Sequence, residues 1–175
     1  MIHWRPYTLD GVVYDLSHLH PITVKYTQTG KDGAREYTVD VAFGLHCFTR
    51  GIVEGETPDS KTQYADAKEV RIFDLDRYEL SKRLPDLVKN LSTALCYHTG
   101  RGNFFTVDII RGDGQNLQYE VYFTVFLSKE GVLVLRVQSA YTRDSSHHIE
   151  RKEKGVKLFI LLFNTQMGRQ TKPSP

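Results

Sequence analysis

The sequence is poor in cysteine, in net charge and in long apolar runs, and each shortage excludes a class of protein. Two cysteines, Cys47 and Cys96, cannot build the disulfide framework of a small secreted domain. No apolar run approaches the roughly 20 residues of a membrane helix, and the residues after Met1 lack the apolar core of a secretion signal. A net charge of only +2 does not by itself argue for nucleic acid. We therefore expect a cytoplasmic protein without membrane association.

The length and composition are those of an ordinary globular domain. The 175 residues fit one domain, 1–175, and 40% hydrophobic with 25% charged residues is a usual balance. A chain of this size buries about two-thirds of its unfolded surface, which is enough for a core. The polar residues from about 169 to 175 predict a flexible tail.

Hydrophobic periodicity in the first half predicts strands followed by a helix. Short strands are expected around 12–14 and 22–26, and residues 51–68 are expected to form a loop. A leucine stripe from Leu80 to Leu95 has helical spacing, and Pro85 should kink this helix or begin a second one. Residues 36–47 alternate clearly, with one apolar face made of Val39, Val41, Phe43, Leu45 and Cys47.

The second half predicts four strands, at 103–111, 118–128, 132–142 and 156–163. Residues 129–131 are a hairpin signal, and the nearly all-apolar run 156–163 predicts a central strand buried on both faces. The element order indicates an α+β fold. Its sheet is expected to be mostly antiparallel, with a C-terminal four-strand meander packed against one kinked helix or helix pair.

A polar cluster around two glycines, Gly100 and Gly102, is the first candidate site. It places His98, Thr99, Arg101 and Asn103 between the predicted helix and the next strand. A glycine-permissive turn rich in donors can hold an anion, with His98 as an acid or base and Arg101 as a phosphate clamp. The structural alternative is equally weighted: a glycine turn whose histidine and arginine complement a helix C-terminus.

His46 and Arg50 form a second cluster with similar chemistry. Two histidines and two arginines could cleave an RNA phosphodiester, with His46 and His98 as acid and base and Arg50 and Arg101 stabilising the phosphorane charge. The alternative is that these are two unrelated strand ends. The hypothesis requires His46 and His98 to lie within about 10 Å of each other, because both must reach one substrate.

Tyr141 and Ser139 are further candidates. They share parity with Leu133, Leu135 and Val137, and a core-facing stripe that turns polar at its end can mark the mouth of a pocket. An ordinary buried hydroxyl with a partner is the alternative that the pattern favours.

A metal site built from His46, Cys47, Cys96 and His98 has suitable residue types for zinc. The spacing matches no standard zinc motif, and His46 and Cys47 point to opposite faces of a strand. We therefore expect neither a metal nor another cofactor.

Five segments give the chain its resemblance to a known family. They are 15–21, 46–51, 77–85, 98–105 and Gln138-Ser139-Ala140-Tyr141. With these segments the chain resembles the bacterial stationary phase growth adaptation proteins over nearly its whole length. The resemblance implies an intracellular role in growth regulation but no particular catalytic residue.

A fainter, architectural likeness is to the RelE-type RNase toxins, whose active sites use basic residues, histidine and tyrosine on a sheet. This chain offers Arg50, His98, Arg101 and Tyr141.

The leading hypothesis is a metal-independent endoribonuclease of toxin type. Its catalytic residues would be His46, His98 and Tyr141, and RNA and a cognate antitoxin would be its partners. The alternative is a non-enzymatic module that binds a protein, a nucleotide or a nucleic acid. In both cases the RNA- or ligand-binding residues would be Arg50, Thr99, Arg101, Asn103 and Ser139.

Overall fold

The computed structural model is α+β, as the sequence predicts, and describes residues 1–31, 33–99, 105–106, 119–142, 155–169 and 171. The α-helices are α1 (Leu75–Ser81), α2 (Leu84–Lys89) and α3 (Leu158–Gln166). The strands are β1 (Tyr7–Leu9), β2 (Val12–Tyr14), β3 (Ile22–Gly30), β4 (Gly33–His46), β5 (Thr49–Arg50), β6 (Gln63–Ala65), β7 (Val70–Phe73), β8 (Leu95–His98), β9 (Phe105–Thr106), β10 (Tyr119–Leu127), β11 (Leu133–Thr142) and β12 (Val156–Lys157).

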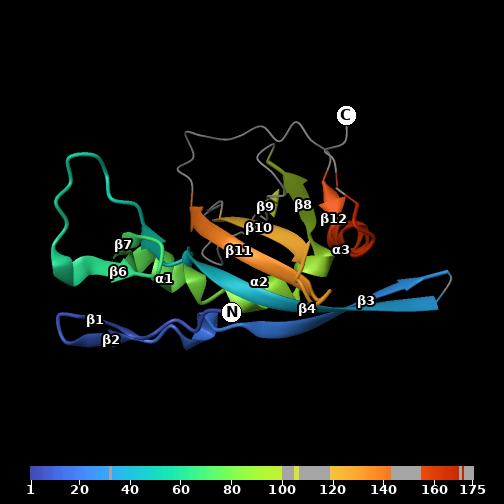
Figure 1. Cartoon of the computed structure of the whole chain (residues 1–175), viewed down its shortest axis with the longest axis horizontal. Helices are drawn as coiled ribbons and strands as arrows, with labels where there is room; N and C mark the ends of the chain where they lie inside the picture. The colour runs from blue at the N-terminus through green and yellow to red at the C-terminus, as the bar shows by residue number, and fades with distance from the viewer. Residues whose placement is uncertain (32, 100–104, 107–118, 143–154, 170, 172–175) are drawn as a thin grey trace, which may run out of the picture.

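A mixed sheet in the order β12-β8-β9-β10-β11-β4-β3 is the main element of the fold (Figure 1). Its strands β8 to β11 are consecutive antiparallel neighbours and make a four-strand meander. Strand β4 joins β11 in parallel and pairs with β3 in an antiparallel hairpin. A small sheet, β5-β7-β6, and the β1–β2 hairpin lie at the end of the molecule opposite the tip of the β3–β4 hairpin (Figure 1).

The alternation in β4 is confirmed and supplies the centre of the core. Val39 and Val41 are fully buried, and Phe43, Leu45 and Cys47 continue the buried face, whereas His46 on the other parity is half-buried. Each fully buried aliphatic side chain contributes about 1.5–3 kcal/mol of transfer free energy. Burial of one parity therefore fixes the register of β4 against β11.

The helical segment breaks where proline predicts. Pro85 stands in the first turn of α2, where its missing N–H costs nothing, and α1 ends before it at Ser81. Asp74 caps α1 by accepting the backbone N–H of Arg77 at 2.9 Å. The stripe does not extend to Leu95, which is 46% exposed in β8, so that part of the helix prediction is wrong. None of the described helices is long and apolar enough to cross a membrane.

The apolar run 156–163 forms mainly a helix, contrary to the expected central strand. Only Val156 and Lys157 pair, as β12 at the sheet edge, and α3 begins at Leu158. Leu158, Leu161 and Leu162 are buried, and Phe159 packs against Tyr37 of β4. An apolar run of this length suits a buried helix as well as a buried strand, so periodicity cannot separate the two.

A β-bulge in β11 overturns the parity expected for Ser139 and Tyr141. The pairing with β10 shifts between Tyr122 and Phe123, so that Phe123 faces Val137 and Tyr122 faces Ser139. Beyond the bulge Ala140 takes the fully buried position, and Ser139 and Tyr141 are half-buried. One extra residue in a strand reverses every later side chain, so the two hydroxyls do not continue the core stripe of Leu133, Leu135 and Val137.

Two predicted segments lie largely outside the described residues. These are most of the strand 103–111 and most of the tail 169–175. Of the tail, Arg169 donates its backbone N–H to the Asn164 carbonyl at 2.8 Å, and Thr171 accepts from the Asn164 side chain at 3.3 Å.

Candidate functional site

The chain turns sharply where β4 ends, and this turn builds the candidate site. The N–H groups of Cys47 and Phe48 donate back to the carbonyls of Gly44 and Leu45, and β5 then pairs with β7 of the small sheet. Thr49 is fully buried in this turn, and its hydroxyl donates to the Leu45 carbonyl at 2.7 Å. The turn therefore presents backbone carbonyls and polar side chains at the junction of the two sheets.

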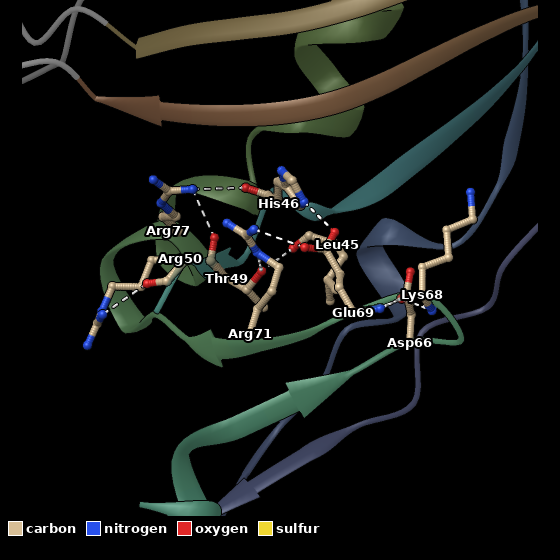
Figure 2. Close-up of polar contacts among 10 residues, drawn as sticks. Leu45, His46, Thr49, Arg50, Asp66, Lys68, Glu69, Arg71 and Arg77 are labelled. Carbon is tan, nitrogen blue, oxygen red and sulfur yellow. Dashed lines mark hydrogen bonds and ion pairs between the residues drawn. The ribbon is translucent and has the colours of Figure 1, made fainter. Parts of the chain in front are cut away.

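A chain of polar contacts runs from His46 across Thr49 (Figure 2). The His46 ring bonds Glu69 at 2.6 Å, and Arg71 bonds the other Glu69 oxygen at 3.2 Å. The hydrogen bond with His46 makes the largest contribution to lowering the pKa of Glu69, and the bond with Arg71 lowers it further, although partial burial opposes both. Arg71 also donates its Nε–H to the Thr49 hydroxyl at 3.0 Å. His46 thus faces a carboxylate, and that carboxylate also neutralises Arg71.

Arg50 is held by a carboxylate of its own loop. Its two terminal nitrogens contact the two oxygens of Glu56 at 2.8 and 2.6 Å, a bidentate pair. The bonds from Arg50 lower the pKa of Glu56 to about 2. A phosphate could bind Arg50 only by competing with this carboxylate. Because both terminal nitrogens of Arg50 already bond Glu56, the structure does not favour the predicted role of Arg50 as a phosphate clamp.

Arg77 of α1 differs from its neighbours because no carboxylate in the described part of the chain pairs with it. One terminal nitrogen donates to the carbonyls of His46 at 3.3 Å and Thr49 at 2.8 Å. Within the described residues Arg77 forms no ion pair. Burial lowers the pKa of Arg77, and Asp74 nearby partly opposes that shift while it caps the helix. The Arg77 guanidinium is thus half-buried and charged, and among the described residues no carboxylate contacts it.

The Arg77 guanidinium lies over the Tyr141 ring of β11, which is one member of an aromatic pair with Tyr122 of β10. Its carbon is 5.2 Å from the centre of the Tyr141 ring, and the Tyr141 ring stacks on Tyr122 with centroids 5.3 Å apart. Both tyrosines are half-buried. We call Arg77, Tyr122 and Tyr141 the arginine–tyrosine stack. A cation beside aromatic rings that keep part of their surface exposed is a recurring way of holding unpaired nucleotides.

The structure gathers four of the predicted site residues and separates two others from them. His46 faces Ser139 across the parallel β4–β11 pair, Tyr141 follows on β11, and Arg50 lies just after the turn. His98 ends β8, which stands four strands from β4 in the sheet order, and Thr99 follows it. Four spacings of about 4.8 Å make roughly 19 Å along the sheet. This separation exceeds the limit for joint acid–base work by His46 and His98.

The surroundings of His98 also differ from the expected helix-to-strand junction. His98 is the last residue of β8 and pairs with Phe105 of β9, while the helical segment ends at Lys89, before a single 3-10 turn. The Thr99 hydroxyl is buried without a hydrogen-bond partner in the described part of the chain. Arg101 and Asn103, the other members of this cluster, lie outside the described residues.

The cysteines do not assemble a metal site with the histidines. Cys47 lies next to β4 and Cys96 on β8, again four strands apart in the sheet. Burial raises the pKa of each thiol to about 12, which keeps both protonated at neutral pH. No group of three histidine, cysteine or acidic residues with metal-binding geometry occurs in the described ranges.

Sequence reasoning missed the residues that complete the site. Arg77 begins segment 77–85, one of the five that carry the family resemblance. Only the fold shows that its side chain reaches the carbonyl groups of the turn after β4. Tyr122 and Glu120 alternate in the sequence with the apolar residues Val121 and Phe123, and that alternation was the available signal. No sequence pattern links Glu69 to His46, or Glu56 to Arg50, which lies six residues before it in the same loop.

Comparison with known proteins gives a family and no close relative. The model of the YjaZ family matches residues 6–166, which is most of the chain. No curated protein and no solved structure shows a significant match. The match includes the candidate site but assigns no reaction to it.

Proposed function

This chain belongs to the YjaZ family, and we propose that it is a non-enzymatic module that binds single-stranded nucleic acid through the arginine–tyrosine stack. The observation that carries the proposal is the half-buried Arg77 guanidinium, which lies 5.2 Å from the Tyr141 ring and has no carboxylate partner in the described residues. A phosphate would supply the missing counter-charge.

The position of Arg77 explains why a phosphate would bind there. A partly desolvated cation attracts an anion more strongly than an exposed one, because water screens the interaction less. Arg71 lies close enough to lower the pKa of Arg77, so both guanidiniums contribute to the local positive potential. Glu69 pairs with Arg71 and not with Arg77. Two carbonyl acceptors hold the Arg77 side chain in place, which reduces the entropy lost on binding.

The paired tyrosines favour a nucleotide over a simple anion. Tyr122 and Tyr141 are already stacked with an angle of 18° between their planes, so their partly exposed surface is ordered before a ligand arrives. Single-stranded nucleic acids bind to grooves that combine cations with aromatic rings. This composition at one site supports the proposal even though the chain has a small net charge.

The distance between the histidines favours binding over cleavage. Joint catalysis by His46 and His98 would require one substrate to contact both ends of a four-strand span. His46 remains beside the stack, bonded to Glu69, and could contact a neighbouring nucleotide. The endoribonuclease of toxin type, with its antitoxin, stays a prediction.

Fluorescence anisotropy with a labelled ten-nucleotide oligouridylate tests the proposal. The wild-type chain should bind at low salt, and Arg77→Gln should weaken binding at least about tenfold, the value of one charge-assisted hydrogen bond. Lys25→Gln is the matched control, because it removes the same charge from an exposed ion pair with Glu36. Absence of binding, or an equal loss in both variants, contradicts the proposal. Cleavage of the RNA by the wild type would instead favour the nuclease hypothesis.

A further inference from the structure

The hydroxyl groups of the arginine–tyrosine stack form a hydrogen-bond relay that ends on a buried carboxylate. The Tyr141 hydroxyl donates to the Tyr122 oxygen at 3.1 Å, and the Tyr122 hydroxyl donates to a Glu120 carboxylate oxygen. Glu120 is 3% exposed, between the equally buried Tyr119 and Val121. A buried carboxylate requires donors, so this group determines the direction of the relay.

The direction of the relay decides what Tyr141 can offer to a ligand. A carboxylate accepts and does not donate, so the Tyr122 proton points toward Glu120. The Tyr122 oxygen is then an acceptor, and the Tyr141 proton points toward it. Tyr141 therefore presents to its surroundings an oxygen lone pair and no proton. The geometry favours a ligand that donates a hydrogen bond at this position.

The acceptor stands beside the cation. The Arg77 guanidinium carbon lies 5.2 Å from the centre of the Tyr141 ring. The Tyr141 oxygen, a hydrogen-bond acceptor, and the cationic guanidinium, which can bind an anion, are therefore neighbours. An RNA nucleotide has the complementary pair: a ribose 2′-hydroxyl that can donate, next to the phosphate of the same nucleotide. DNA has the phosphate and lacks the hydroxyl.

We propose that the Glu120–Tyr122–Tyr141 relay makes the site selective for RNA over DNA, with the Tyr141 oxygen accepting a hydrogen bond from a ribose 2′-hydroxyl while Arg77 binds the adjacent phosphate. This inference rests on the proposed binding function and identifies its substrate class. Tyr141 is then a specificity-determining residue, and Tyr122 and Glu120 are positioning residues that act through it.

Binding of two oligonucleotides that differ only in the 2′-hydroxyl tests the relay. Ten-nucleotide oligouridylate and the same sequence of deoxyuridine should differ in affinity for the wild type by about three- to tenfold, the value of one neutral hydrogen bond. Tyr141→Phe should reduce this ratio to near one by weakening RNA binding alone, because the ring and its stack remain. Tyr122→Phe should reduce the ratio too, although Tyr141 is intact, because the Tyr141 proton loses its partner.

The outcomes distinguish the two proposals. If neither oligonucleotide binds, the binding function itself is wrong. If both bind equally well to the wild type, or if Tyr141→Phe and Tyr122→Phe keep the wild-type ratio, the relay does not read the sugar while the binding function stands. Tyr37→Phe is the control for loss of a hydroxyl, since the Tyr37 hydroxyl is buried without a hydrogen-bond partner in the described residues. It should leave the ratio unchanged.

Discussion

Tyr141 stacks on Tyr122 across the β10–β11 pair, with ring centroids 5.3 Å apart and 18° between the ring planes. The β-bulge of β11 makes this contact possible. Without the extra residue Tyr141 would continue the parity of Val137 into the core, and Tyr122 would face a different partner. A single local irregularity therefore places an aromatic pair beside Arg77.

Removing the Tyr141 ring should weaken nucleic-acid binding. Tyr141→Leu leaves an apolar side chain but no π-face for a base or for Arg77. Base stacking on an aromatic ring contributes about 1–3 kcal/mol, so the Kd for RNA should rise at least about fivefold. Anisotropy titration measures this change, and Tyr141→Phe on a deoxyuridine oligonucleotide is the control that should keep its affinity. Equal Kd values for Tyr141→Leu and the wild type would show that the Tyr141 ring does not contribute to RNA binding.

Adding a methyl group at Gly44 should destabilise the β4–β11 junction. A Cβ at this position would lie 2.8 Å from the Gln138 carbonyl oxygen, a backbone atom that cannot move without shifting the bulge. Overpacking of this kind costs about 1–3 kcal/mol. Urea denaturation of Gly44→Ala measures the loss. Gly51→Ala, whose Cβ would find its nearest atom at 3.9 Å, should stay within about 0.5 kcal/mol of the wild type.

The Thr49 hydroxyl should matter for stability more than its size implies. It is fully buried, donates to the Leu45 carbonyl and accepts from Arg71. Thr49→Val keeps the shape but leaves the Arg71 Nε–H without its acceptor and the Leu45 carbonyl with only the bond from the Phe48 N–H, which should cost about 1–3 kcal/mol of unfolding free energy. Thr49→Ser retains the hydroxyl and should lose less. A Thr49→Val protein as stable as the wild type would show that Arg71 and the Leu45 carbonyl find other partners.

His18 should make stability fall in mild acid. Burial is the main reason that the pKa of His18 lies below 6.5, although Asp15 opposes the shift. The unfolded chain therefore binds a proton at a higher pH than the folded chain, so the stability that neutral His18 contributes is complete above pH 6.5 and is lost as the pH falls toward the folded-state pKa. Thermal unfolding between pH 8 and 5 should show this slope, and His18→Gln should reduce it. An unchanged slope would exclude His18 as its source.

Local patterns predicted much of the fold because they reflect which side chains are buried. The alternation of β4, the break at Pro85 and the hairpin between β10 and β11 each follow from residues close in sequence. The helix α3 could not be predicted in this way, since Leu158 to Phe163 are apolar on every side. The candidate site was predictable only in part. His46, Ser139 and Tyr141 were each candidates from the sequence, but their meeting was not predicted, because the bulge and the approach of Arg77 depend on contacts between distant segments. The pairing of Arg50 with Glu56 is local, but no sequence pattern marked it.

The salt dependence of RNA binding tests the central role of Arg77 most directly. For a single strand, each phosphate neutralised by the protein contributes about −0.7 to the slope of log K against log salt concentration. Arg77→Gln should therefore make the slope shallower by about 0.7, and Lys25→Gln should leave it unchanged. If Arg77→Gln keeps the wild-type slope, Arg77 contacts no phosphate and the proposed site is wrong.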